Sequence, residues 1–212
     1  MIKEKYIIPA IIAKNQNELV DKINKVKDYV DIIQLDVMDG NFVPNNSINF
    51  DFNLPETKCK FEGHLMIEKT KLWIEQNYQL VDTVLAHYES MIKPSEVIEL
   101  TRSKGKKIGF VLNPETPVEK IRDFIDEIDQ VLIMTVKPGF YGSQFIRETL
   151  EKVSKLREIK PDLEIEVDGG ISGKTIELAD EAGANRFVSG SYILKSDDVK
   201  KSIDTLKEKI KN

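Results

Sequence analysis

The feature that most constrains the fold is a regular alternation of two kinds of segment along the chain. Short runs rich in Ile, Val and Leu alternate with longer charged stretches in which apolar residues recur at helical spacing. Several of the runs are almost continuously apolar, which is typical of parallel strands buried on both faces. We predict eight strands, at residues 7–12, 32–36, 61–66, 83–87, 107–112, 130–136, 163–168 and 185–189.

The segments between these runs have the pattern of amphipathic helices, at residues 17–27, 70–78, 93–104, 117–127, 144–159, 174–182 and 197–211. Thr116 followed by Pro117 is typical of a helix start, with Thr116 as the N-cap. Gly183, shortly before the last strand, is typical of a helix end. Residues 45–59 are rich in Asn, Phe and Pro, and we predict a long loop there with at most a short helix.

Eight strands alternating with helices predict an α/β fold, a (β/α)8 or TIM barrel, formed by residues 1–212 as one domain. The chain has 212 residues, about 26 for each unit, which is close to the shortest length of this fold. An open doubly wound sheet also alternates strands and helices and is the structural alternative. The count of eight, and the lack of a Gly-x-Gly-x-x-Gly motif after the first strand, favour the barrel.

Composition excludes several classes of function. The net charge of -5 and an isoelectric point near 5.3 argue against binding of nucleic acid through a basic face. No apolar run approaches the ~20 residues of a membrane-spanning helix. Cys59 is the only cysteine, which excludes an internal disulfide and a cysteine-rich zinc site. We therefore expect a cytoplasmic protein with no nucleic-acid or membrane partner.

Polar residues fall at the carboxyl ends of the predicted strands, where (β/α)8 barrels build their active sites. Asp36 ends the second strand, Asp168 ends the seventh, and His64 lies in the third. Because side chains alternate along a strand, Gln34 and Asp36 share a face and can both point inward. An inward-facing carboxylate is costly unless it is paired or binds a metal. Either aspartate alone fits a turn or a cap, but the two together favour a catalytic site.

Glycines follow three consecutive strands, the sixth, seventh and eighth. Any one of them is explained by an ordinary turn. Together they indicate a phosphate site, because glycine lets backbone N–H groups approach an anion closely. The residues concerned are Gly139, Gly142, Gly169, Gly170 and Gly190, with Ser191 next in the chain. The inference is a phosphorylated small-molecule substrate.

The remaining candidates at the strand ends have simpler interpretations. Met38, Met66 and Met134 are expected to fill gaps in the core and to form the floor of the site. His87, at the end of the fourth strand, is better explained as a structural residue than as a ligand.

Longer strings in the chain resemble those of ribulose-phosphate 3-epimerases, in family order and spacing from Pro9 to about Ile193. They are long and specific, and they cover nearly the whole chain. The strings are Asp36-Val37-Met38-Asp39-Gly40-x-Phe42-Val43-Pro44-Asn45, His64-Leu65-Met66, Gly109-x-x-Leu112-Asn113-Pro114-x-Thr116-Pro117, Met134-Thr135-Val136-x-Pro138-Gly139-Phe140-x-Gly142, Val167-Asp168-Gly169-Gly170 and Ser189-Gly190-Ser191.

The resemblance implies a barrel of ribulose-phosphate-binding type that inverts C3 of a ketose phosphate, such as D-ribulose 5-phosphate. Asp36 and Asp168 would transfer the C3 proton on opposite faces through an enediolate. A divalent metal (zinc, iron or manganese) would stabilise that enediolate, held by Asp36, His64 and Asp168, with Gln34 at the fourth position. The resemblance also implies a homo-oligomer. It places the substrate and its phosphate against His64, Gly139, Phe140, Tyr141, Gly142, Gly169, Gly170, Gly190 and Ser191.

The chain departs from the family pattern at defined positions. The family has His where this chain has Gln34, and an amide oxygen is a harder ligand that suits zinc poorly. Ala10 replaces a Ser that contacts substrate, and Tyr141 and Ser143 replace Gly and Gln in the phosphate loop. Metal binding and sugar recognition are therefore the properties that we expect to differ.

Two alternatives follow from the same residues. Sister families on this barrel cleave or decarboxylate sugar phosphates, but they carry Asp-x-Lys-x-x-Asp at a strand end. The string Asp36-Val37-Met38-Asp39 lacks that Lys. The second alternative is a sugar-phosphate-binding protein without turnover, for which the changes at Gln34 and Ala10 are the argument.

Overall fold

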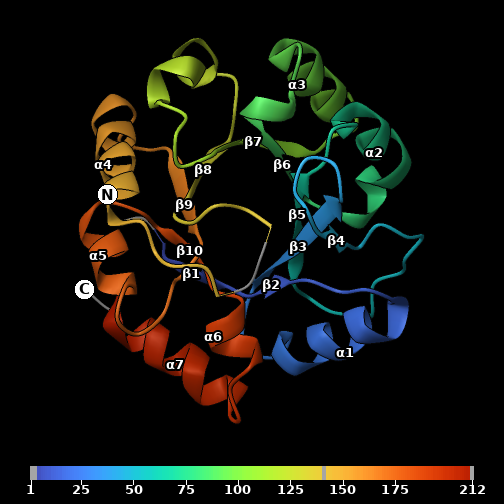
Figure 1. Cartoon of the computed structure of the whole chain (residues 1–212), viewed down its shortest axis with the longest axis vertical. Coiled ribbons are helices and arrows are strands. Elements are labelled where there is room, and N and C mark those ends of the chain that lie inside the picture. The colour runs from blue at the N-terminus through green and yellow to red at the C-terminus, as the bar shows by residue number, and fades with distance from the viewer. Residues whose placement is uncertain (1–3, 140–141, 211–212) are drawn as a thin grey trace.

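Parallel strands form the centre of the structure and confirm the predicted (β/α)8 barrel (Figure 1). In this computed structural model, which describes residues 4–139 and 142–210, the hydrogen-bonded order is β1-β10-β9-β8-β7-β6-β5-β3-β2. The bounds are β1 Tyr6–Ile8, β2 Ala10–Ile11, β3 Ile32–Asp39, β4 Asn46–Ser47, β5 Lys60–Met66, β6 Thr83–His87, β7 Lys107–Leu112, β8 Gln130–Met134, β9 Glu164–Asp168 and β10 Arg186–Val188. The short strand β4 pairs antiparallel with β3, within the predicted loop at 45–59.

The first predicted strand closes the barrel and is interrupted once. Pro9 divides it into β1, which pairs with β10, and β2, which pairs with β3. Proline has no N–H to donate to a ladder. Its carbonyl nevertheless accepts a hydrogen bond of 3.0 Å from the backbone N–H of Gln34. One continuous segment therefore joins the two edges of the sheet.

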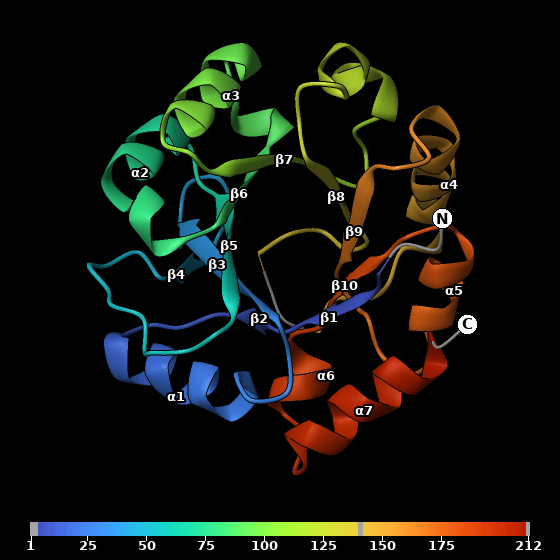
Figure 2. The ribbon, with the colours of Figure 1, turned by 180° about the vertical axis from the view of Figure 1, so that it is seen from behind.

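Helices surround the barrel on its outside, as the view from behind also shows (Figure 2). The α-helices are α1 Gln16–Val26, α2 Thr70–Asn77, α3 Pro94–Ser103, α4 Leu150–Ile159, α5 Ile176–Glu181, α6 Ser191–Leu194 and α7 Val199–Lys209. Asn15 and Asp198 cap α1 and α7, because their side chains accept the backbone N–H of Glu18 and Lys201. No helix in the described part of the chain is long and apolar enough to cross a membrane.

Two predicted helices differ from the structure. Residues Val118–Phe124 form a 3-10 helix whose N-cap is Pro117, so the prediction of Thr116 as N-cap is wrong. The Thr116 side chain is hydrogen-bonded to Glu89 instead. The helix predicted from residue 144 begins only after the 3-10 turn Arg147–Thr149. The backbone N–H of Ile146 donates to the carbonyl of Thr135 at 2.7 Å, which keeps the preceding segment at the barrel mouth.

The barrel interior contains two polar layers. At the amino ends of the strands, Arg186 lies between Glu62 and Glu166, with N–O distances of 2.5 and 2.9 Å. All three side chains are buried. One step further along the same strands, β5 carries His64 and β9 carries Asp168. This second layer lies at the carboxyl ends of the strands, where the predicted site residues meet.

Candidate active site

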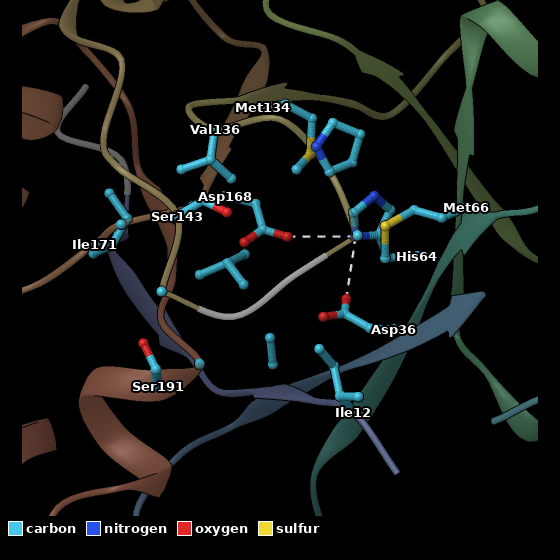
Figure 3. Close-up of a pocket in the computed structure, with 18 of the residues that line it drawn as sticks. Ile12, Asp36, His64, Met66, Met134, Val136, Ser143, Asp168, Ile171 and Ser191 are labelled. Atoms are coloured by element: carbon cyan, nitrogen blue, oxygen red, sulfur yellow. Dashed lines mark hydrogen bonds and ion pairs between the residues drawn. The ribbon is translucent and has the colours of Figure 1, made fainter. Parts of the chain in front are cut away.

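Three strands bring Asp36, His64 and Asp168 together. Asp36 of β3 pairs in register with His64 of β5, and Asp168 ends β9. His64 Nδ1 lies 3.2 Å from Asp36 Oδ1 and 3.3 Å from Asp168 Oδ2, so the two carboxylates face one imidazole nitrogen (Figure 3). One ligand atom from each residue lies within 4.8 Å of the other two.

Gln34 lies directly against this group and is fully buried. Its Nε2 donates to Asp36 Oδ1 and to Asp168 Oδ2, both at 2.8 Å, and lies 3.2 Å from His64 Nδ1. Its Oε1 has no hydrogen-bond partner among the described residues. A buried amide oxygen without a partner is costly. The amide therefore joins all three predicted ligands through its nitrogen and leaves its oxygen unsatisfied.

Burial and charge act in opposite directions on these groups. Burial, together with the charge of Asp168, raises the pKa of Asp36. Burial alone would lower the pKa of His64, but hydrogen bonds to Asp168 and Asp36 and their charges outweigh it and raise that pKa to about 9. The site therefore favours a bound positive charge between its two carboxylates.

A second buried histidine continues the site away from the carboxylates. His64 Nε2 lies 2.9 Å from His87 Nε2, and His87 Nδ1 lies 3.3 Å from Glu89 Oε2. Burial lowers the pKa of His87 to about 4, so this ring is neutral and carries one proton. Donation of that proton to Glu89 leaves His87 Nε2 to accept from His64 Nε2–H. His64 Nδ1 is then the atom that faces Asp36 and Asp168.

The sequence pattern predicts His87 as a structural residue and does not predict its contact with His64. The available signal was its position at the end of β6, directly beside the strand that carries His64. Glu89, two residues later, holds its place by accepting the backbone N–H of Asn113 at 2.9 Å. Burial would raise the pKa of Glu89, but hydrogen bonds from His87, Thr116 and Asn113 outweigh it and lower that pKa, which keeps Glu89 an acceptor.

The glycine-rich strand ends line the same pocket as the acidic pair. The predicted residues among its lining are Gly139, Gly142, Gly169, Gly170, Gly190 and Ser191, while Phe140 and Tyr141 lie outside the described residues. At Gly169 the backbone φ is +118°, and a Cβ atom would lie 2.4 Å from Val136 Cγ2. A side chain at this position is therefore disfavoured by both conformation and space.

Hydrogen bonds to backbone carbonyls hold these loops in place. Thr135 Oγ1 donates to the carbonyl of Gly169 at 2.5 Å, and Thr175 Oγ1 donates to that of Gly170 at 2.7 Å. Asn45 Nδ2 donates to the carbonyl of Gly139 at 2.9 Å. The Asn45 bond connects the loop after β3 to the loop after β8, so the two sides of the pocket mouth are tied together.

Apolar side chains complete the pocket. Met38, Met66 and Met134 are almost completely buried and line the pocket. The pocket is also lined by side chains that the sequence reasoning did not single out: Ile12, Val136, Ile171 and Val188. Ala10, where the family pattern has Ser, lies in the same lining.

The donor set fits a divalent cation. Two carboxylates and an imidazole converge within 4.8 Å, and the unsatisfied Oε1 of Gln34 is a fourth oxygen adjacent to them. Carboxylate and amide oxygens with imidazole are ligands that Mn²⁺, Fe²⁺ and Zn²⁺ accept in proteins. The fold and these paired acids at the strand ends are those of a (β/α)8-barrel enzyme.

Comparison with known proteins assigns the family. The model of the ribulose-phosphate 3 epimerase family matches residues 6–194. The ribulose-phosphate 3-epimerase of Bacillus subtilis is 38% identical, covering 95% of this chain and 97% of its own. The ribulose-phosphate 3-epimerase of Schizosaccharomyces pombe is 34% identical, covering 96% of this chain and 93% of its own. The chain belongs to the ribulose-phosphate 3-epimerase family, which makes it an isomerase, a sugar-phosphate epimerase.

Solved structures of more distant proteins share the fold. The 3-keto-L-gulonate-6-phosphate decarboxylase from Vibrio cholerae has a TM-score of 0.71 at 14% identity, covering 99% of this chain and 98% of its own. Orotidine 5'-phosphate decarboxylase from Pyrococcus horikoshii has a TM-score of 0.65 at 15% identity, covering 97% and 99%. At these identities the likeness extends to the barrel alone.

Proposed function

We propose that this chain interconverts D-ribulose 5-phosphate and D-xylulose 5-phosphate by moving a proton at C3. The observation that carries the proposal is the convergence of Asp36 and Asp168, from strands β3 and β9, on one buried point of a single pocket. Inversion at a carbon that bears a proton needs a base on one face and an acid on the other. Relatives named ribulose-phosphate 3-epimerase support this choice of substrate.

In this reaction one aspartate accepts the C3 proton and the other donates a proton to the opposite face of the enediolate. The pair therefore needs one proton between its two members, and the roles of the two exchange in the reverse direction. The raised pKa of Asp36, caused by burial and by the charge of Asp168, supports a site in which one of the two acids is protonated.

Asp36, His64 and Asp168 are the residues that would hold the metal. When bound, a divalent cation supplies stabilisation of the negative charge that develops on the enediolate oxygens. His64 serves this arrangement by presenting Nδ1, because its Nε2–H is directed to His87. The methionine floor excludes water from the carbon that loses its proton.

The phosphate is proposed to lie at the opposite side of the pocket, against the loops after β8, β9 and β10. Gly170, Gly190 and Ser191 line that side, and Ser191 begins α6. The first backbone N–H groups of a helix have no partner within the helix, so they are available to an anion. Gly169 supports this proposed phosphate site, because without a side chain it lets the loop after β9 pass against Val136.

Proton exchange tests the proposal directly. The purified protein, supplied with Mn²⁺, is incubated with D-ribulose 5-phosphate in heavy water and followed by NMR. We expect deuterium at C3 together with D-xylulose 5-phosphate. Binding of the sugar phosphate without exchange would contradict the proposal in favour of a binding protein. Release of a smaller carbon fragment would contradict it in favour of a lyase.

A further inference from the structure

The two polar atoms of the Gln34 amide differ in their hydrogen bonding: Nε2 has partners, and Oε1 has none among the described residues. Its Nε2 is surrounded by the ligand atoms of the site, at 2.8 Å from Asp36 Oδ1, 2.8 Å from Asp168 Oδ2 and 3.2 Å from His64 Nδ1. Its Oε1 is buried and has no partner in the described part of the chain. The amide is satisfied only as a donor, at a position where two carboxyl groups and an imidazole converge.

A half-turn of the terminal amide exchanges these two atoms with almost no change of shape. Oε1 would then face the same three ligand atoms. An oxygen cannot donate to either carboxylate, but a divalent cation placed among Asp36, His64 and Asp168 would be coordinated by Oε1 and by all three ligand atoms together. A cation at this position would therefore give Oε1 a partner and would also be bound by the three convergent ligand atoms.

We propose that Gln34 binds the metal through Oε1 and thereby shifts the preference of the site from Zn²⁺ toward harder cations such as Mn²⁺. The donor set becomes three oxygens and one imidazole nitrogen. Carboxylate and amide oxygens suit Mn²⁺, whereas a second imidazole would suit Zn²⁺. The proposal rests on the proposed function only in taking these residues as a metal site.

Zn²⁺ binds most sites of this kind more tightly than Mn²⁺ in absolute terms, so the informative quantity is a ratio of affinities. The apoprotein is titrated with Mn²⁺, with free ion measured by electron paramagnetic resonance, and with Zn²⁺ in competition with a chromophoric chelator. The ratio of the two dissociation constants is compared between the native chain, Gln34→His and Gln34→Leu.

We expect Gln34→His to move the ratio toward Zn²⁺ by about tenfold or more, and Gln34→Leu to weaken Mn²⁺ binding by a similar factor. Electron spin echo modulation of bound Mn²⁺ should detect one histidine nitrogen in the native chain and two in Gln34→His. Gln130→Leu is the matched control, because Gln130 is buried in the other polar layer of the same barrel. It should leave the ratio unchanged.

Thermal unfolding of each variant shows whether it is folded before the titration. The proposal is overturned if folded Gln34→His and the native chain have the same ratio, or if Gln34→Leu binds Mn²⁺ as tightly as the native chain. It is also overturned if the native chain binds neither ion. These outcomes need no substrate, so a changed ratio in a chain without epimerase activity would remove the proposed function and leave this inference standing.

Discussion

Replacement of Arg186 by Met should destabilise the barrel far more than loss of a surface arginine. The guanidinium is buried between Glu62 and Glu166 at N–O distances of 2.5 and 2.9 Å, and Gln130 Nε2 donates to both carboxylates at 3.2 Å. Each carboxylate already has one oxygen without a hydrogen-bond partner among the described residues. Removal of the cation leaves the two acids in the interior, where Gln130 still donates to both of them.

Breaking a buried ion pair by removing one partner costs about 3–5 kcal/mol. Because Gln130 still donates to both acids, we expect the lower end, about 3 kcal/mol in the free energy of unfolding. Burial and the charge of Glu62 already raise the pKa of Glu166 well above its usual range. Without the guanidinium Glu166 binds a proton still more readily in the folded state than in the unfolded chain. The deficit should therefore grow as pH rises through the raised pKa that Glu166 has in the native chain, and shrink as pH falls below it.

Urea unfolding followed by circular dichroism, at neutral and at mildly acidic pH, measures this difference. Arg102→Met is the matched control, because Arg102 pairs with Asp129 at the surface and should cost at most about 1 kcal/mol. The double variant Arg186→Met/Glu62→Gln removes one charge of each sign and should recover most of the loss. The reasoning is refuted if Arg186→Met is as stable as Arg102→Met, or if its deficit grows on acidification.

Three further predictions follow from single contacts. His87→Leu leaves His64 Nε2–H without its acceptor, and we expect a loss of Mn²⁺ affinity of about 10–100-fold, measured by titration; an unchanged affinity would show that His87 does not orient His64. Gly169→Ala places a Cβ against Val136, and we expect a loss of about 1–3 kcal/mol in the free energy of unfolding and a higher KM for the sugar phosphate. An unaltered KM would contradict the proposed phosphate site. Burial would raise the pKa of Asp39, but hydrogen bonds from three backbone N–H groups outweigh burial and lower that pKa. The Asp39 carboxylate therefore stabilises the fold above its unfolded-state pKa, and this stabilisation is lost as pH falls through its lower folded-state pKa. Urea unfolding should show that Asp39→Asn is destabilising at pH 7 and that the difference shrinks as pH falls below the usual aspartate value of ~3.9; a constant difference would argue against this.

The positions of Asp36, His64 and Asp168 could be predicted because strand periodicity determines them. Residues at the carboxyl end of a barrel strand face the mouth whatever the neighbouring strands contain. The place of Met38 and Met66 in the pocket lining follows from the same rule, since these residues continue the inward face of β3 and β5.

Lateral distances across the barrel could not be predicted from the chain. His87 contacts His64 because β5 and β6 are adjacent and their ring nitrogens come to 2.9 Å, which depends on register and rotamer. The amide of Gln34 raises the same difficulty, since its orientation is decided by acceptors on three strands. The predicted helix start at residue 144 is wrong for a related reason, since α4 begins at Leu150. The first residues of the predicted helix have helical spacing, but a hydrogen bond to Thr135 holds them at the pocket.

The central claim is that Asp36 and Asp168 move the C3 proton on opposite faces. The most direct measurement follows hydrogen exchange in heavy water, starting separately from D-ribulose 5-phosphate and D-xylulose 5-phosphate, for Asp36→Asn and Asp168→Asn. The control is Asp39→Asn, an aspartate of the same strand whose carboxylate accepts backbone N–H groups. We expect each site variant to lose at least about 10²-fold in epimerisation, and residual exchange to favour opposite epimers in the two variants, while the control keeps its rate. Full epimerisation by either Asp36→Asn or Asp168→Asn would contradict the account.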